Sequence, residues 1–402
     1  MHKGSDKVAD AGPATLPARP CRPERTAVRL PPPSLPHLLL LSACSAAVTG
    51  AAAAVIDGAA DPTLLPAAGR DLYVAPDGDD ANPGSRHAPL RTIGAAARLA
   101  AAAGRGAAGI TVHVAPGSYP ETVKTTASGR AGARIRYLSS VKWGAKVVGA
   151  GSEAVWTNLG QQVEIAGFDL SGSGRAGILN YGSWVTMRGN HVHDLALSGG
   201  CTGSGGGGIV NANYKAGHGE IVGNLVHDIG VPGACAGVHG IYYANGQGRI
   251  RNNIVYRASA WGIHLWHAAD QVVIANNTVF ANGSDKIGGG IVAGTGDSPG
   301  GVLLSGTRIV DNIVVYNPRS SIRQYCNPGE SCIGAGNVVA NNVVFGNGVG
   351  IEMRVGKASG TIARDPRFVD FRPDGSGNYR LRRGSPAIGR GAAPDIAGAP
   401  LP

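Results

Sequence analysis

The sequence has few charged and few aromatic residues, and its most apolar segment lies near the N-terminus. Charged residues make up 15 % and aromatic residues 5 % of the 402 residues. Outside the segment that begins at Leu38, no run is long and apolar enough to cross a membrane as a helix. No nucleic-acid-binding motif accompanies the formal net charge of +10. These absences argue against a membrane span in the mature chain and against a nucleic-acid partner.

The positive charge is unevenly distributed along the chain. Residues 354–390 hold 9 basic and 3 acidic residues, whereas residues 45–353 are nearly balanced, with 21 basic against 19 acidic residues. A basic end of this kind could attract an acidic polymer. It could equally be a basic, soluble end cap, and the sequence leaves both interpretations open.

Two short sequence patterns alternate between Ala176 and Arg354. The first is Gly-Ile followed by alternating residues, and its isoleucines are Ile178, Ile209, Ile241, Ile263, Ile291 and Ile351, with Ser321-Ile322 as a variant. The second places Asn two residues before Val, and its asparagines are Asn190, Asn224, Asn253, Asn277, Asn312 and Asn342. Successive asparagines are 34, 29, 24, 35 and 30 residues apart. A constant pattern with a variable period predicts one structural coil per repeat, with insertions confined to loops.

Each pattern is short, alternates with a period of two and is rich in β-branched residues, as is typical of a strand. The shortest repeat, from Asn253 to Asn277, has no room for a crossover helix. We therefore predict an all-β solenoid in which parallel strands of successive coils stack about 4.8 Å apart. The isoleucines then form an inward apolar column. The asparagines form a second column at a tight turn, where each side-chain amide can bond to the next coil.

At this point the chain resembles the right-handed parallel β-helix proteins of the pectate-lyase-like superfamily. The resemblance covers roughly residues 71–390. The segment that begins Tyr73-Val-Ala-Pro-Asp-Gly, followed by Pro89-Leu-Arg-Thr-Ile, is similar to the entry segment of secreted bacterial β-helices, including family nine pectate lyases. Asp365-Pro-Arg-Phe-Val and Ser385-Pro-Ala-Ile are similar to their exit segment. This resemblance implies the fold, but lyases, hydrolases, epimerases and binding proteins all share it.

The domain organisation follows from these patterns. We predict a basic leader with an export signal at residues 1–56, a linker at 57–70, the β-helix at 71–390 and a tail at 391–402. Leu-Ser-Ala-Cys at residues 41–44 resembles a bacterial lipoprotein signal, which makes Cys44 a candidate lipidation site and leaves a lipid anchor open. Thr92 is predicted to cap an Ala-rich helix that ends near Ala103 and covers the first coil. The expected product is an exported monomer.

The cysteines indicate an oxidising compartment. Cys201 and Cys235 each lie seven residues after an aspartate of successive coils, so coil stacking would bring their backbones to disulfide distance. Cys326 and Cys332 enclose a short loop that can also close. Two plausible disulfides and no CxxC pair favour export. Metal ligation by Cys201 and Cys235 is the competing interpretation.

A candidate active site follows from the strand alternation. The residue after each pattern isoleucine is expected to point outward, which places Tyr242 beside His264 on one exposed sheet. Trp266 shares this outward parity, and His239 and His267 lie at the ends of the same strands. Such a group could bind and process a sugar, with Trp266 and His267 contacting the substrate. The alternative is that these aromatic residues are only packing beneath a loop.

A second group recurs just before two long loops. His193-Asp194 and His227-Asp228 occupy equivalent places in successive coils. Stacked carboxylates repel each other unless a cation lies between them, so Asp194 and Asp228 are candidate Ca²⁺ ligands. The competing interpretation is structural, because the same column continues as Tyr256 and Phe280, which would let both histidines pack beneath the loops.

These residues predict a lyase acting by β-elimination on a polymer that contains uronic acid. Such an enzyme must neutralise the substrate carboxylate, remove the proton at C5 and protonate the leaving oxygen. We assign the base to His264 and the acid to Tyr242. Arg323, Lys286 or a cation are candidates to neutralise the carboxylate. An epimerase of the same fold and a non-catalytic carbohydrate-binding or envelope protein remain the alternatives, since neither the calcium-site aspartates of pectate lyases nor an outward strand lysine is found.

Overall fold

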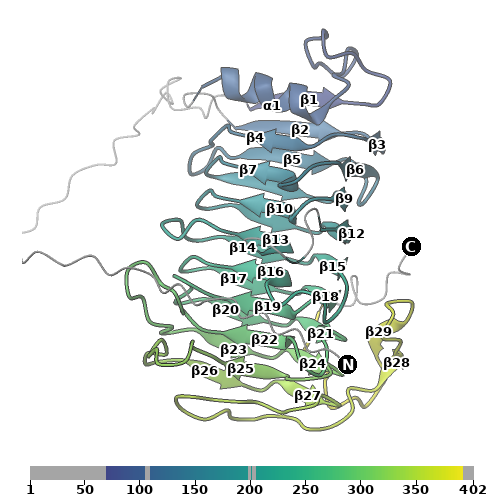
Figure 1. Ribbon diagram of the computed structural model, residues 1–402. Coiled ribbons are helices and arrows are strands. Elements are labelled where there is room, and N and C mark those ends of the chain that lie inside the picture. Colours follow the sequence, from purple (N-terminus) through teal and green to yellow (C-terminus); the bar gives the residue numbers. More distant parts are fainter. Residues whose placement is uncertain (1–68, 105–108, 198–200, 202–204, 393–402) are drawn as a thin grey trace, which may run out of the picture. The chain divides into compact units, whose positions relative to one another are not determined.

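The computed structural model describes residues 69–104, 109–197, 201 and 205–392. Among these residues the chain forms three long parallel sheets, one helix and one antiparallel hairpin. Successive coils lie on one another, and each coil between the first and the last contributes one strand to each sheet (Figure 1). The predicted all-β, right-handed parallel β-helix is confirmed.

Sheet 1 contains ten strands. In spatial order they are β1 (Arg70–Val74), β2 (Ile110–Val114), β5 (Ile135–Ser139), β8 (Val163–Ala166), β11 (Thr186–Arg188), β14 (Glu220–Val222), β17 (Arg249–Arg251), β20 (Val273–Ala275), β23 (Arg308–Val310) and β26 (Val338–Ala340). Sheet 1 begins each coil, and its strands precede the predicted Asn column.

Sheet 2 contains the Gly-Ile strands. In spatial order its strands are β4 (Val123–Thr125), β7 (Ala154–Asn158), β10 (Ala176–Asn180), β13 (Gly206–Asn211), β16 (Val238–Tyr243), β19 (Trp261–Leu265), β22 (Gly289–Ala293) and β25 (Ile322–Gln324). Sheet 3 contains β3 (Gly117–Tyr119), β6 (Ala145–Gly149), β9 (Asp169–Ser173), β12 (His191–Ala196), β15 (Leu225–Ile229), β18 (Ile254–Ala258), β21 (Thr278–Phe280), β24 (Ile313–Val315) and β27 (Val343–Phe345). Each coil therefore runs from sheet 1 to sheet 3 to sheet 2.

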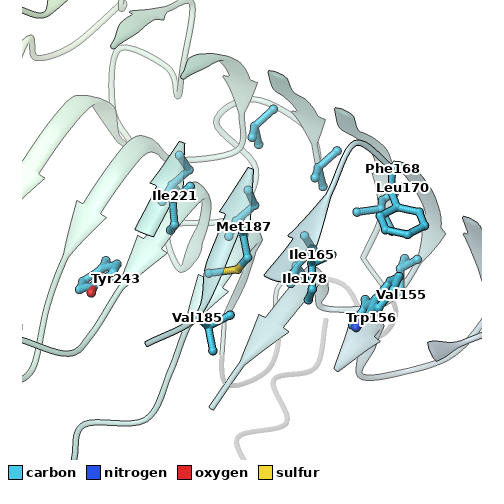
Figure 2. Close-up of a cluster of buried hydrophobic side chains, with 14 of the residues drawn as sticks. Val155, Trp156, Ile165, Phe168, Leu170, Ile178, Val185, Met187, Ile221 and Tyr243 are labelled. Carbon is cyan, nitrogen blue, oxygen red and sulfur yellow. The ribbon is translucent and has the colours of Figure 1, made fainter. Parts of the chain in front are cut away.

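The interior is a set of stacked apolar columns. The predicted isoleucine column is in register, since Ile178 pairs with Ile209, which pairs with Ile241. The six pattern isoleucines from Ile178 to Ile322 are fully buried, and Ile351 packs against the same core while partly exposed. Figure 2 shows side chains of this core, among them Ile165, Ile178 and Met187, packed between the sheets. Burial of such columns is the main favourable contribution to folding.

The asparagine column forms a hydrogen-bonded ladder at the turn between sheets 1 and 3. The backbone N–H and the side-chain amide of Asn253 both donate to Oδ1 of Asn277, at 3.0 and 2.9 Å. In the same way, the backbone N–H of each ladder asparagine donates to Oδ1 of the asparagine in the next coil, from Asn190 to Asn224 and onward to Asn342. The residue before each ladder asparagine has a positive φ, for example 56° at Asn252 and 65° at Gly223. This position tolerates Gly, Asn or Asp because it is left-handed.

Helix α1 (Ile93–Ala102) covers the first coil of the described β-helix, whereas a C-terminal hairpin packs beside sheet 3 (Figure 1). Helix α1 begins after Thr92, whose hydroxyl accepts the N–H of Ala95 at 3.1 Å, as predicted for its N-cap. Near the C-terminus of the described chain, β28 (Phe368–Asp370) and β29 (Asn378–Leu381) form an antiparallel hairpin. Tyr379 of this hairpin packs on Phe280 at 4.6 Å between ring centroids.

Both predicted disulfides are present. The Cα atoms of Cys201 and Cys235 are 5.1 Å apart and those of Cys326 and Cys332 are 5.6 Å apart. Because the Cys201 and Cys235 sulfurs are bonded to each other, the alternative that they ligate a metal is wrong. In the described ranges no helix is long and apolar enough to cross a membrane. Cys44, the leader at 1–56, most of the linker and residues 393–402 of the tail lie outside the described residues.

Candidate functional site

The strand register of sheet 2 brings Tyr242 directly beside His264, as the alternation predicted. Both side chains are partly exposed on the outer face of the sheet. They line a cleft of about 460 Å³. The other residues that line it are Arg175, Gly205, Gly206, Val210, Ala212, Tyr214, Ala236, Gly237, His239, Trp266, His267 and Asp297. Five of the seven residues assigned to catalysis or substrate binding from the sequence thus line this cleft, and His239 is one of them.

A chain of hydrogen bonds fixes the protons of two cleft histidines. The backbone N–H of Trp261 can only donate, and it lies 3.3 Å from Nδ1 of His239. Nδ1 of His239 is therefore the acceptor, so in the neutral ring Nε2 carries the proton. This Nε2 lies 2.8 Å from Nδ1 of His264, which must then accept. The proton of a neutral His264 consequently lies on Nε2.

Burial keeps both rings neutral. It lowers the pKa of His239 to about 3. Burial also lowers the pKa of His264 well below its usual range, and the neighbouring His239 and His267 lower it further. A buried imidazole loses the hydration that would stabilise its charged form. A neutral His264 with its proton on Nε2 is a hydrogen-bond donor toward a ligand, which does not favour the general-base role expected from the sequence.

The neutral ring of His267 carries its proton on the other nitrogen, Nδ1. Its Nδ1 lies 3.2 Å from the backbone carbonyl oxygen of Asp297, and a carbonyl can only accept. Nδ1 of His267 is thus protonated, and in the neutral ring Nε2 carries the lone pair. The ring of Tyr214 packs beside it at 4.4 Å. His267 therefore supplies a basic nitrogen in the same cleft as the donors on His264 and Tyr242.

Trp266 forms a wall of the cleft. It is only 8 % exposed, its Nε1–H donates to Oδ2 of Asp297 at 3.2 Å, and its ring stacks on Tyr325 at 5.8 Å. These contacts leave little of its ring free for a sugar. Its position fits packing better than the substrate-stacking role expected from the sequence.

Two expected residues lie away from the cleft lining. Arg323 follows the predicted outward column, but its Nε lies 3.6 Å from a carboxylate oxygen of Glu352 and its guanidinium lies over Tyr325. Lys286 is exposed in the loop before β22, and its carbonyl accepts from Arg319. Neither residue lines the cleft.

Sequence reasoning missed three cleft residues of chemical interest. Arg175 precedes the first Gly-Ile strand, Tyr214 follows the second, and Asp297 lies in the turn after β22. Arg175 and Tyr214 flank pattern strands, so a search of strand ends would have found them. Asp297 comes from a turn 30 residues after His267, and the repeat gives no signal for it.

The predicted His-Asp pairs form a second cluster, on the outer face of sheet 3. Asp194 and Asp228 directly precede the register partners Leu195 and Ile229, and each carboxylate lies 2.7 Å from Nδ1 of the preceding histidine. Asp228 also pairs with Arg257. His227 stacks on Tyr256 with ring centroids 4.6 Å apart, and Tyr256 stacks on Phe280 at 4.9 Å, so the column continues as the structural interpretation expected.

Asp169 and His191 complete this second cluster, and the sequence analysis did not identify them. His191 Nδ1 lies 2.8 Å from Oδ2 of Asp169, and His193 Nε2 lies 3.1 Å from its Oδ1. Although burial opposes ionisation, the hydrogen bonds from His191 and His193 hold the pKa of Asp169 well below its usual range. Burial lowers the pKa of His191 to about 4, whereas the pKa of His193 is raised against burial by its bonds to Asp169 and Asp194.

A larger hollow of about 590 Å³ lies over sheet 1. Trp184 and His218 stack there with ring centroids 3.7 Å apart, beside Arg134 and several glutamines. Arg134 is held by the carbonyl of Trp184 and the hydroxyl of Thr186, at 2.6 and 3.0 Å. The residues lining this hollow include no bonded histidine pair, so the sheet 2 cleft is the better candidate for catalysis.

Comparison with known proteins supports the fold. A family model described as "Protein of unknown function (DUF1565)" matches residues 76–127. Pectate lyase Pel9A is similar in structure with a TM-score of 0.53 and 18 % identity, over 80 % of this chain and 92 % of that one. An alginate lyase from Paenibacillus sp. str. FPU-7 has a TM-score of 0.39 and 16 % identity, over 73 % and 99 %. The Dettilon tailspike protein has a TM-score of 0.45 and 16 % identity, over 68 % and 50 %. No curated protein matches the sequence.

Proposed function

We propose that this protein is an exported lyase that cleaves a uronic-acid-containing polymer by β-elimination in the sheet 2 cleft. The proposal rests on one observation: the cleft contains both a proton acceptor and proton donors. The neutral tautomer of His267 has its lone pair on Nε2, while Nε2 of neutral His264 and the Tyr242 hydroxyl can donate protons. β-Elimination needs a proton acceptor and a proton donor acting on the same sugar pair.

The roles follow from these proton positions. Nε2 of His267 removes the proton from C5 of the uronate, and the electron pair of that C–H bond forms the C4=C5 double bond. The C4–O bond breaks, and the leaving oxygen takes a proton from the Tyr242 hydroxyl. Burial raises the pKa of Tyr242, so the hydroxyl stays protonated until the leaving oxygen develops charge. The proton then returns to Tyr242 from the His267 imidazolium through solvent.

The substrate carboxylate requires a positive or proton-donating partner, because its negative charge opposes removal of the C5 proton. Arg175 lines the cleft, and we assign it to bind the substrate carboxylate. It takes the role for which the sequence suggested Arg323 or Lys286. The protonated Nε2 of His264 adds a neutral donor. An acidic polymer is therefore the proposed partner of a monomeric protein, and Ca²⁺ remains a variable to test.

The test is a screen of uronic-acid polymers with the purified protein, with and without Ca²⁺. Product is followed by the ultraviolet absorbance of the unsaturated uronate, and chain length and uronate configuration are measured in parallel. Absorbance that rises with the parent protein and falls by roughly 100-fold or more in His267→Gln supports the proposal. The control variant His218→Gln, on sheet 1, should keep the parent rate.

Other outcomes would identify the alternatives. A change in uronate configuration without chain cleavage would make the protein an epimerase. Polymer binding without any chemical change would make it a carbohydrate-binding protein. Full activity in both His267→Gln and Tyr242→Phe would remove the cleft from the mechanism. Export and lipidation of Cys44 are tested separately by the mass of the protein recovered from the cell envelope.

A further inference from the structure

A column of side chains follows the turn between sheets 2 and 1, beside the larger hollow and away from the proposed lyase cleft. Glu164, Thr186 and Glu220 are register partners in sheet 1. The residue two positions before each of them therefore occupies the same place in its coil, and the later strands continue the register. In chain order the column contains Gln162, Trp184, His218, Gln247, Gln271, Gly306 and Gly336.

All residues of this column have a left-handed backbone, with φ angles from 50° at Gln271 to 75° at Gly336. This conformation is unfavourable for a residue with a Cβ atom and normal for glycine. The last two coils of sheet 1 have Gly306 and Gly336 at this place. The turn itself therefore does not require a side chain.

The turn between sheets 1 and 3 provides a comparison within the same coils. It also has one left-handed residue per coil, and there the chain has Gly189, Gly223, Asn252, Asn276, Asp311 and Asn341. Gly, Asn and Asp are the residues that tolerate this conformation best. A tryptophan and three glutamines at the same backbone angle depart from this pattern. Bulky residues in unfavourable backbone conformations gather at ligand-binding sites, which makes the column a candidate for one.

Trp184 is the exposed aromatic residue of the column. It is 47 % exposed, and His218 stacks against one face of its indole with ring centroids 3.7 Å apart. Nη2 of Arg134 donates to the carbonyl oxygen of Trp184 at 2.6 Å and to the hydroxyl of Thr186 at 3.0 Å. These contacts fix the backbone and the ring together. A fixed apolar ring at the edge of a polar hollow suits the apolar face of a sugar.

The glutamines supply hydrogen-bonding groups along the same line. Within the described part of the chain, the side-chain amides of Gln162 and Gln247 have no hydrogen-bond partner, and that of Gln271 bonds Asp270 at 3.0 Å. An amide both donates and accepts, which matches sugar hydroxyls. At a strand spacing of about 4.8 Å, the column from Gln162 to Gln271 extends over roughly 19 Å. That is the length of a short oligosaccharide.

The charged groups of the hollow are already bonded within the protein. Nη1 of Arg249 lies 3.1 Å from a carboxylate oxygen of Glu220. Arg134 donates to the carbonyl oxygens of Val163 and Trp184. An uncharged chain complements such a surface, whereas a polyuronate would bring its carboxylates near Glu220.

We propose that the sheet 1 hollow binds an uncharged segment of a polysaccharide, with one sugar ring stacked on Trp184 and hydroxyl groups bonded to the glutamine amides. This site lies on a different sheet from the lyase cleft and takes a ligand without carboxylates. The inference therefore goes beyond the proposed function and does not depend on it.

The experiment is affinity gel electrophoresis of the full chain in gels that contain a soluble β-glucan, xylan, galactan or mannan. Polygalacturonate and alginate serve as charged comparators, and each binding constant is measured at low and high salt. At least one uncharged polymer should retard the parent protein equally at both salt concentrations. Trp184→Gly should weaken this binding by roughly 10-fold or more. Gln247→Ala should weaken it by about 3- to 10-fold.

Trp184→Gly is chosen because glycine suits the left-handed backbone at this position, as Gly306 shows two coils beyond Gln247. The variant should therefore stay folded, which its thermal unfolding checks. The control is Val349→Ala, an equally exposed apolar residue outside the hollow, and it should bind as the parent does. The proposal is overturned if no uncharged polymer retards the folded parent, if binding is confined to the acidic polymers and is lost at high salt, or if folded Trp184→Gly binds like the parent. Cleavage of a soluble uronate polymer should be unchanged in Trp184→Gly, so this site and the lyase cleft can fail separately.

Discussion

The two histidine clusters occupy equivalent outward positions on different sheets, yet their hydrogen-bond partners give them different chemistry. In the sheet 2 cleft, His239 and His264 bond to each other and to a backbone N–H, and burial keeps them neutral. In the sheet 3 cluster every Nδ1 meets a carboxylate, and each Nε2 meets either Asp169 or another histidine. The first arrangement suits proton transfer, whereas the second connects the neighbouring strands β9, β12 and β15 to one another. The hydrogen-bond partners of a histidine, more than its place on the strand, determine which of its nitrogens carries a proton.

The largest expected effect concerns the cleft alone. Tyr242→Phe removes the hydroxyl that we propose protonates the leaving oxygen, and it keeps the ring that packs beside His264. We expect the turnover number on the active polymer to fall by roughly 10²- to 10³-fold with little change in KM or thermal stability. His193→Gln, in the other cluster, should retain the parent turnover number. Equal losses in both variants would show that the clusters are not functionally separate.

The second prediction concerns the disulfide between the loops that lead from sheet 3 to sheet 2. Cys201 and Cys235 are 34 residues apart in sequence, whereas Cys326 and Cys332 are only 6 apart. A longer closed loop restricts the unfolded chain more. The double substitution Cys201→Ser/Cys235→Ser should lower the free energy of unfolding by about 3 kcal/mol. Urea unfolding should show a smaller loss for Cys326→Ser/Cys332→Ser, and the reverse order would contradict the loop-entropy argument.

The third prediction concerns the carboxylate that holds the sheet 3 cluster together. Asp169 is 9 % exposed and bonds both His191 and His193. Asp169→Asn leaves a buried histidine contact unsatisfied, so we expect a loss of about 1–3 kcal/mol in the free energy of unfolding. Asp285→Asn, at an exposed loop position, is the matched control. Lyase activity should survive both changes, and a loss of activity in Asp169→Asn alone would couple the two clusters.

The repeat made the scaffold predictable. A period-two pattern places Ile178, Ile209 and Ile241 in one column because parallel coils keep their register, and the same register predicted the Cys201–Cys235 disulfide. It also placed Tyr242 beside His264. Such predictions need only the strand alternation and the coil spacing, both of which are local properties of the sequence.

The site was less predictable because it depends on departures from the repeat. Asp194 and Asp228 adopt left-handed angles of 45° and 50°. Between Val192 and Leu195 the register with β9 shifts, which interrupts the alternation and turns His193 toward Asp169. The proton positions of the cleft histidines also depend on single contacts, such as the hydrogen bond from the backbone N–H of Trp261 to Nδ1 of His239. No sequence pattern reveals such a contact. In the proposed mechanism the base is therefore His267, whereas the sequence favoured His264.

The smallest expected effect tests the neutral state of the cleft through its pH dependence. The folded pKa of His239 is about 3, below its ordinary 6.5, because burial penalises the charged ring. Between these values the unfolded chain binds more protons than the folded one, so stability is complete above pH 6.5 and falls as the pH drops toward 3. From pH 7 to pH 5 we expect a loss of about 2 kcal/mol from this group. His239→Asn should lose less stability than the parent over this interval, whatever its stability at pH 7. His218→Gln, measured in the same urea titrations, should retain the parent slope. An unchanged slope in His239→Asn would mean that the ring is charged in the folded protein, and the assignment of the His264 proton to Nε2 would then fail.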